Sequence, residues 1–309
     1  MIIQAPAPAA EVAEIANLQS RAATLLRASS DYVSLTKPRI AVLLLITELG
    51  SMVAAARGWP GARLVGLALL GGALSAGGAS AVNCWFDRDI DARMDRTCTR
   101  ALPAGRIAPA RALGFGIMLG AAGFMLLALA TNWLAAWLAL AGGAFYVIVY
   151  TMWLKRSTPQ NIVIGGAAGA FPPLVGWAAV TGRIEPAALA LFAVILAWTP
   201  PHFWSLALLL QRQYREVRVP MLPVVAGAAV TRRAVLRYSL LLAGVSLAPG
   251  VWLGPAYLWS AVALGVPFLV LAELGRRYDD RRWAVRLFHY SLVYLAALFA
   301  AVGVAGALK

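Results

Sequence analysis

Long apolar runs, separated by polar connections, dominate this chain. The runs are about 18–25 residues long, which is the length that crosses a hydrocarbon core of roughly 30 Å. They cover residues 39–56, 63–82, 112–130, 133–153, 161–180, 186–209, 234–254, 256–275 and 286–307. No run alternates apolar and polar residues with a period of two, so the pattern predicts helices rather than barrel strands. The predicted fold class is all-α: a polytopic membrane protein with nine transmembrane helices.

The composition supports this prediction and excludes other classes of protein. Of the 309 residues, 61% are hydrophobic and 13% are charged, whereas soluble proteins have about 45–50% and about 25%. The two cysteines, Cys84 and Cys98, are too few to staple a chain of this length. The sequence therefore describes neither a soluble single-core enzyme, nor a disordered chain, nor a disulfide scaffold.

Positive charges lie almost entirely on one set of loops. Only four of the 27 lysine and arginine residues fall on the other set: Arg57, Arg63, Arg183 and Lys309. By the positive-inside rule, the N-terminus is predicted to be cytoplasmic and the chain to lie in the cell inner (plasma) membrane. This placement accounts for the net charge of +14 without a nucleic-acid partner.

Two parts of the chain are predicted: a cytoplasmic N-terminal tail, residues 1–36, and a single intramembrane domain, residues 37–309. The tail has no apolar core behind a basic start, so a cleaved signal peptide is not expected. Within the tail, residues 11–28 fit either a helix on the membrane surface or a disordered segment. The long polar loops 83–111 and 211–233 are predicted to be cytoplasmic, and long loops in compact folds are usually functional.

Acidic residues gather in the first of these loops. Asp87, Asp89, Asp91 and Asp95 are four of only 13 acidic residues in the chain. If the second span continues as a helix, Asn83, Asp87 and Asp91 lie one turn apart on one face. Like charges at this spacing oppose helix formation by a few tenths of a kcal/mol per pair, so a compensating cation is expected. Oxygen ligands that leave coordination positions free match Mg²⁺ with substrate phosphates.

The remaining charged residues of this loop have simpler interpretations. Asp89 has Arg93 four residues on, so we predict a surface ion pair between them. Arg96 and Arg100 follow at a spacing that suits contacts to phosphate oxygens. The alternative is a solvated helix end whose acids pair with neighbouring arginines. The position of the acids at the end of a membrane span favours the functional interpretation.

Other polar positions are more ambiguous from the residues alone. Lys155 and Arg156 fit diphosphate contacts and ordinary positive-inside anchors equally well. His202 follows two prolines near the inner end of the sixth span, where a broken helical ladder can line a cavity. Its imidazole suits a haem-iron ligand or an acid–base group, although a lone histidine is more often simply hydrogen-bonded. The glycines and prolines of the fifth span are interpreted as packing residues.

Several strings resemble a known family. The series Asn83-x3-Asp87-x3-Asp91, followed by Arg96 and Arg100, resembles the first aspartate-rich motif of the UbiA-type intramembrane prenyltransferases. Further strings resemble the branch of that family that farnesylates haem b, over about residues 31–300. They are Thr36–Arg39, Asn83–Arg96, Leu154–Asn161, Gly165–Trp177, Pro201–Ala207 and Val219–Val224.

This resemblance implies a fold, substrates and a set of site residues. The fold is nine helices around a central cavity, in the lipid bilayer. The implied substrates are farnesyl diphosphate and haem b, and the implied products are haem O and diphosphate. The implied cofactor is Mg²⁺. The implied protein partners are a haem A synthase or a terminal oxidase assembly. By position, the implied metal and catalytic residues are Asn83, Asp87 and Asp91, joined by Lys155 in catalysis. The implied diphosphate contacts are Arg96, Arg100, Arg156 and Lys37, and the implied haem-side residues are His202 and Tyr150.

The sequence departs from the family pattern at two positions. Ala101 stands where a proline often follows Arg100, and little effect is expected from that change. Gln213 stands where an Asp usually precedes Tyr214, so a second metal in this loop lacks its carboxylate, and Glu216 is the candidate substitute. Two rival functions use the same features. One is a prenyltransferase of the same superfamily that acts on an aromatic quinone precursor. The other is a membrane transporter. The position of the acids argues against a transporter, because they gather at one end of the spans, whereas transporter binding sites lie near mid-membrane.

Overall fold

A computed structural model describes residues 26–309, and its regular secondary structure over that range is helical. The first half of the chain, up to residue 181, holds α2 (Pro38–Ala56), α3 (Ala62–Phe86), α4 (Arg88–Asp91), α5 (Pro109–Ala130), α6 (Trp133–Ala144), the π-helix η1 (Phe145–Leu154), α7 (Lys155–Ser157), α8 (Asn161–Gly165) and α9 (Ala167–Thr181). The second half holds α10 (Pro186–Leu209), α11 (Gln211–Glu216), α12 (Leu222–Val225), α13 (Gly227–Val245), α14 (Gly250–Leu253), α15 (Pro255–Arg277) and α16 (Arg281–Ala307).

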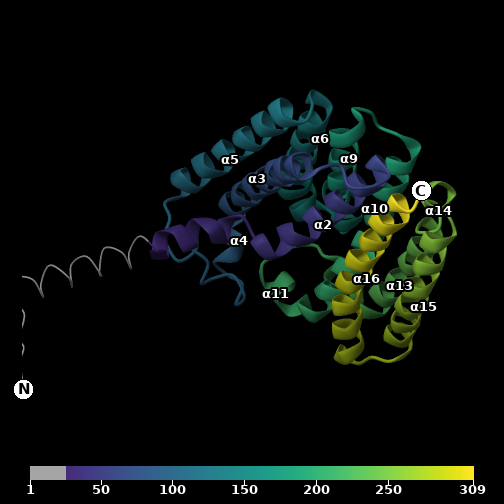
Figure 1. Cartoon of the computed structure of the whole chain (residues 1–309). Coiled ribbons are helices and arrows are strands. Elements are labelled where there is room, and N and C mark those ends of the chain that lie inside the picture. Colours follow the sequence, from purple (N-terminus) through teal and green to yellow (C-terminus); the bar gives the residue numbers. More distant parts are fainter. Residues whose placement is uncertain (1–25) are drawn as a thin grey trace, which may run out of the picture.

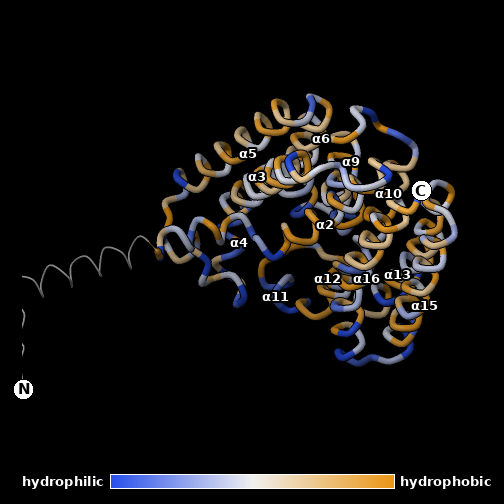
Figure 2. The backbone as a smooth tube through the Cα atoms, in the orientation of Figure 1, coloured by the Kyte–Doolittle hydropathy of each residue, from blue (hydrophilic) through white to orange (hydrophobic). Residues whose placement is uncertain are grey.

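The predicted membrane spans are confirmed. Nine helical stretches within residues 26–309 are long and apolar enough to cross a membrane. Three of them are built from consecutive pieces: α6 with η1 and α7, α8 with α9, and α13 with α14. Hydrophobic residues follow the long helices, whereas hydrophilic residues gather at the connecting loops (Figure 2). The seventh and ninth spans begin at Gly227 and Arg281, earlier than predicted, because helical turns that contain arginines precede each apolar run.

Prolines and close helix contacts shape the bundle. Proline occupies the first turn of α2, α5, α10 and α15, where its missing N–H costs no hydrogen bond. The helices α3 and α5 run side by side (Figure 1) and nearly touch, since a Cβ on Gly78 would lie 2.6 Å from the carbonyl oxygen of Gly116. Small residues permit this approach, as is common between membrane helices.

Two segments behave differently from the sequence patterns. Helix α10 continues through Pro200 and Pro201 without a break, so the tandem prolines remove hydrogen bonds but do not end the helix. Residues 26–35 form a helix ahead of α2. The rest of the predicted surface segment, up to residue 25, lies outside the described residues.

Candidate active site

The acidic motif lies on one helical track that crosses from α3 into α4. The N–H of Asp87 donates to the Asn83 carbonyl at 2.9 Å, and the N–H of Asp91 donates to the Asp87 carbonyl at 2.8 Å. These bonds join residues four apart, so the three side chains follow one another at intervals of one turn. All three are buried, and Asp87 is only 2% exposed. The motif is therefore an enclosed feature rather than a solvated helix end.

Each polar side chain of this track meets a cation, which comes from a distant segment for Asn83 and Asp87 and from the same loop for Asp91. The Lys37 ammonium, just before α2, donates to Asn83 Oδ1 at 2.5 Å. Lys155, at the end of η1, forms a hydrogen-bonded ion pair with Asp87. Arg100 donates to Asp91 Oδ2 at 2.9 Å. The fold thus brings together residues that are predicted separately as metal ligands and as diphosphate contacts.

The amide of Asn83 is fixed in orientation. Its Nδ2 donates to Asp87 Oδ2 at 2.8 Å and to Thr151 Oγ1 at 3.0 Å. With both partners on the nitrogen side, the amide oxygen points toward Lys37. Thr151 is fully buried in η1 and was not among the predicted site residues, because nothing in its local sequence marks it.

The pairing of Asp89 differs from the prediction. Its carboxylate accepts two hydrogen bonds from Arg156, at 2.7 and 2.8 Å, rather than pairing with Arg93. Arg93 instead donates to the Asp89 backbone carbonyl. The prediction failed because only the tertiary fold brings Arg156 beside α4. These hydrogen bonds hold the pKa of the Asp89 carboxyl below its usual value. Arg156 also lies 3.5 Å from Asp87 and over the ring of Phe86.

A π-helix supplies one wall of the site. Over η1 the backbone makes bonds five residues apart, such as the one from the Lys155 N–H to the Tyr150 carbonyl. Tyr146 and Tyr150 stack with ring centroids 5.7 Å apart and planes within 15°. Gly165 leaves room for this stack, since a Cβ there would lie 2.3 Å from the Tyr150 ring. Such segments often occur at functional sites.

The donor set fits a magnesium–diphosphate group. Asp87 Oδ1 is buried without a hydrogen bond, so one carboxylate oxygen is available as a ligand. Within residues 26–309 no three acid, histidine or cysteine side chains converge. Asn83, Asp87 and Asp91 offer two carboxylates and an amide, a donor set of the kind that Mg²⁺ supplements with substrate phosphates and water.

The second polar loop approaches the first. Arg96 lies 3.5 Å from the Tyr214 hydroxyl on α11, and Arg212 lies 3.6 Å from Asp95. The side-chain oxygen of Gln213 is buried without a hydrogen bond. Glu216, the candidate substitute for a carboxylate at position 213, instead lies 3.6 Å from Arg212 on the surface.

His202 belongs to α10, and its side chain contacts α16. Its ring is stacked between Trp198 and Phe288, with centroids 4.3 and 4.9 Å away, and its Nδ1 lies 2.6 Å from Ser291 Oγ. Its contacts among the described residues come from these two helices and not from the acidic track. The other histidine, His289, is exposed and contacts the Val285 carbonyl.

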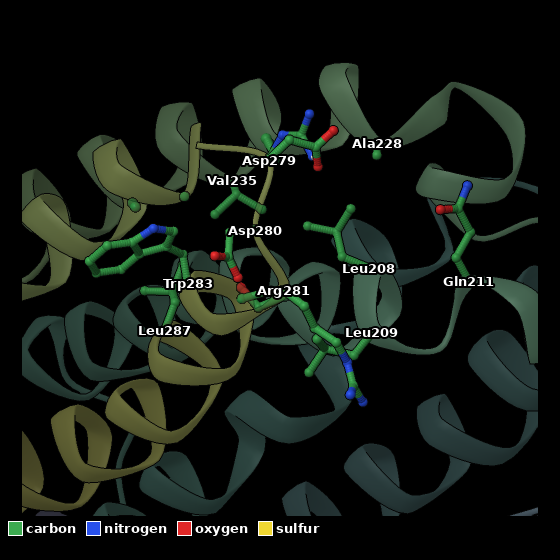
Figure 3. Close-up of a pocket in the computed structure, with 15 residues that line it drawn as sticks. Leu208, Leu209, Gln211, Ala228, Val235, Asp279, Asp280, Arg281, Trp283 and Leu287 are labelled. Atoms are coloured by element: carbon green, nitrogen blue, oxygen red, sulfur yellow. The ribbon is translucent and has the colours of Figure 1, made fainter. Parts of the chain in front are cut away.

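A cavity of about 230 Å³ lies one turn beyond His202, between the ends of α10, α13, α15 and α16. Figure 3 shows Trp283 and Asp280 on one side of it and Leu208 on another. Arg232, also in its wall, is ion-paired with Asp279. The residues that line this cavity come from none of the helices that carry the acidic motif.

The arrangement of the nine spans within residues 26–309 matches the fold of two solved structures. A structure of a UbiA homologue from Archaeoglobus fulgidus, bound to DMAPP and Mg²⁺, superposes with a TM-score of 0.65 at 17% identity, covering 89% of this chain and 99% of that one. A structure from work on digeranylgeranylglyceryl phosphate synthase in membranes gives a TM-score of 0.75 at 18% identity, covering 92% and 100%. At these identities the likeness shows the fold.

Sequence comparison then identifies the family. Residues 44–293 match the UbiA prenyltransferase family, and the chain belongs to that family. It is 54% identical over 278 residues to the protoheme IX farnesyltransferase of Symbiobacterium thermophilum, across 88% of this chain and 92% of that one. It is 51% identical to the protoheme IX farnesyltransferase of Gloeobacter violaceus, across 91% and 93%.

Proposed function

We propose that this protein transfers the farnesyl group of farnesyl diphosphate to a vinyl group of haem b, with addition of water, to give haem O and diphosphate. The product would serve haem–copper oxidase cofactor biosynthesis. The similarity to protoheme IX farnesyltransferases over nearly their whole length supports the choice of substrates. The observation that carries the chemistry is the buried track of Asn83, Asp87 and Asp91. Asn83 and Asp87 each meet a lysine from a distant segment, and Asp91 meets Arg100 of the same loop.

Magnesium is the proposed cofactor, and Asn83, Asp87 and Asp91 are its proposed protein ligands. The buried Asp87 oxygen without a hydrogen bond supports this assignment, as does the Mg²⁺ in the Archaeoglobus homologue. When bound, Mg²⁺ acts as a Lewis acid on the diphosphate. With Gln213 in place of a carboxylate, at least one ion is proposed and a second is not assigned.

The cationic side chains have a double role in this proposal. In the free protein, Lys37, Lys155 and Arg100 neutralise the buried motif. On substrate binding, the same side chains, with Arg96 and Arg156, turn to the diphosphate oxygens. They stabilise the negative charge that develops as the allylic C–O bond breaks, which is where preorganised charge contributes most to rate.

The opposite charge develops on the farnesyl carbon. The stacked rings of Tyr146 and Tyr150 on η1 are suited to stabilise this positive charge by cation–π contact. The vinyl group of haem then forms the C–C bond, water adds to the resulting cation, and one proton is released. We assign Tyr150 and His202 to the haem side of the site.

Orientation and partners follow from the proposed chemistry. The strongly basic end of the bundle faces the cytoplasm in this proposal, so that diphosphate stays in water while the farnesyl chain and porphyrin lie in the bilayer. The cell inner membrane is the proposed location. A haem A synthase or a terminal oxidase assembly is the proposed recipient of the product.

The test uses membranes that contain the chain and matched membranes that lack it. Labelled farnesyl diphosphate is supplied with haem b or with 4-hydroxybenzoate, and the pigments are separated and identified. Label in a haem O product, only when the chain and Mg²⁺ are present, is the expected result. Label in 4-hydroxybenzoate instead would assign the chain to quinone-precursor chemistry, and label in neither acceptor would overturn the proposed reaction.

A further inference from the structure

Ser291, on α16, makes contacts that converge on His202. Its hydroxyl oxygen lies 2.6 Å from the Phe288 carbonyl oxygen and 2.6 Å from His202 Nδ1. Its own backbone carbonyl accepts a hydrogen bond from Trp198 Nε1 at 2.8 Å. The side chain is fully buried, so no solvent competes for these contacts. One residue thus holds both the imidazole and one of the two rings that sandwich it.

A count of hydrogen atoms fixes the direction of these bonds. A serine hydroxyl has one hydrogen, and a carbonyl oxygen can only accept. The short contact to the Phe288 carbonyl therefore uses the Ser291 hydrogen, since two oxygens 2.6 Å apart would otherwise repel. The hydroxyl must then accept from His202, so the hydrogen of the imidazole is on Nδ1.

The surroundings favour a neutral ring. The aromatic and hydrogen-bonding partners of His202 within the described residues are Trp198, Phe203, Phe288 and Ser291, and none is a carboxylate. A buried imidazolium without a counter-charge is costly. A neutral ring with its hydrogen on Nδ1 carries its lone pair on Nε2.

We propose that Ser291 is a positioning residue that holds His202 as the Nδ1–H tautomer, so that the lone pair of Nε2 is presented to the haem substrate. This inference rests on the proposed function for its ligand, because the haem iron is the electrophile of that substrate that a neutral imidazole nitrogen binds. Hydrogen bonds of this kind to the second ring nitrogen orient histidine ligands in metal sites generally. The stacked Trp198 and Phe288 rings fix the plane of the imidazole.

The tautomer can be measured directly, because the chain has only two histidines. In protein labelled with ¹⁵N-histidine and carrying His289→Gln, a single imidazole remains, and the nitrogen shifts show which atom is protonated. We expect a protonated Nδ1 and an unprotonated Nε2, converted to a mixture by Ser291→Ala. A hydrogen on Nε2 before substitution, or an unchanged tautomer after it, would overturn the proposal.

Haem binding provides the second measurement. We expect Ser291→Ala to weaken the affinity for haem b about 10-fold and to alter its absorption spectrum, while Ser291→Thr restores both. Farnesyl diphosphate binding should not change. The matched control is Ser239→Ala, since Ser239 is an equally buried serine whose hydroxyl donates to the Val235 carbonyl without a histidine partner. Equal haem affinity in Ser291→Ala, or equal losses for both substrates, would contradict the positioning role.

The two proposals fail separately. If the tautomer and the Ser291-dependent haem spectrum are found but no farnesyl group reaches haem, the proposed reaction is wrong and the positioning role stands. If haem is farnesylated but Ser291→Ala changes neither tautomer nor haem affinity, the positioning role is wrong and the reaction stands.

Discussion

At the residue scale, Asp87 meets two of the cations of the site and the amide of Asn83. It accepts from Asn83, forms an ion pair with Lys155 and lies 3.5 Å from Arg156. We predict that Asp87→Asn and Asp87→Ala lower kcat at least about 100-fold, because the proposed Mg²⁺ loses a carboxylate ligand and Lys155 loses its ion-pair partner. Turnover of labelled farnesyl diphosphate measures this effect. Size-exclusion profiles in detergent should show that both variants fold.

The matched control for this prediction is Asp95→Asn. Asp95 belongs to the same loop, but its side chain is 72% exposed and lies 3.6 Å from Arg212. Exposed pairs of this kind contribute little, so its kcat should stay close to that of the unsubstituted protein. Full activity in Asp87→Asn would remove the metal and diphosphate role of the motif.

Asp89 has a more limited effect at the same scale, because it acts through Arg156. We predict that Asp89→Asn raises the KM for farnesyl diphosphate several-fold with little change in kcat, since Arg156 loses the two hydrogen bonds that hold it beside Asp87. Arg93→Gln is the control, because the side-chain hydrogen bond of Arg93 within residues 26–309 goes to the Asp89 backbone and not to its carboxylate. A larger rise in KM for Arg93→Gln than for Asp89→Asn would instead support the ion pair between Asp89 and Arg93 that the sequence predicts.

The pH dependence of this ion pair follows from the lowered pKa of Asp89. A carboxyl whose pKa is lowered on folding adds stability above its ordinary pKa, and that contribution is lost as the pH falls through the lowered value. The pair is therefore intact from neutral to mildly acidic pH. We expect the KM effect of Asp89→Asn to be constant over that range, as measured by steady-state kinetics.

At the scale of elements, the contact between α3 and α5 depends on the absence of side chains. A Cβ on Gly78 would lie 2.6 Å from the Gly116 carbonyl oxygen and from the Gly120 nitrogen, and these backbone atoms cannot rotate away. We predict that Gly78→Ala destabilises the protein by about 1–3 kcal/mol, the usual cost of overpacking. Thermal unfolding in detergent measures the loss.

Gly114→Ala is the control for this helix contact. Gly114 also lies in α5, but a Cβ there meets nothing within 4 Å. Alanine is the better helix former, so its Tm should be unchanged or higher. A lower Tm for Gly114→Ala than for Gly78→Ala would show that the close approach of α3 and α5 does not limit stability.

The π-helix is the element that the sequence pattern does not predict. Residues 145–154 are apolar and aromatic, so their periodicity indicates only a membrane helix. Whether backbone bonds span four or five residues depends on the neighbours, and here Tyr150 packs against Gly165 while Thr151 bonds to Asn83. The π-helix thus coincides with these tertiary contacts and carries the stacked Tyr146 and Tyr150.

At the scale of the whole molecule, the two cysteines allow the orientation to be measured. Cys98 is exposed on the loop that carries the acidic motif, whereas Cys84 is buried in α3. We predict that a membrane-impermeant maleimide labels Cys98 in inverted inner-membrane vesicles but not in intact cells, because the positive charges retain that end in the cytoplasm. Gel shift or mass spectrometry reads the labelling.

The control places a cysteine at the opposite end of the membrane spans. Cys98→Ser should abolish labelling, and Ala62→Cys in that background should be labelled only in intact cells, since Ala62 is exposed at the opposite end of α3. Labelling of Cys98 from outside would place the site on the external face and contradict the predicted orientation.

By itself, the sequence determines the nine membrane spans and the spacing of the acidic motif. Both depend on local periodicity: the length of an apolar run matches the bilayer, and residues four apart share a helix face in any α-helix. The family motif likewise lies within a few consecutive turns of the second span and its loop. Such features survive whatever the packing of the other helices.

Only the tertiary structure decides which partners these residues meet. Lys37 and Lys155 contact Asn83 and Asp87 from segments 46 and 68 residues away. Asp89 pairs with Arg156 rather than with Arg93. Ser291 contacts His202 from 89 residues away. A charged or polar side chain has many sequence-compatible partners, and its free energy depends on the few that the fold places within hydrogen-bond distance. Helix packing, which no local pattern specifies, makes that selection.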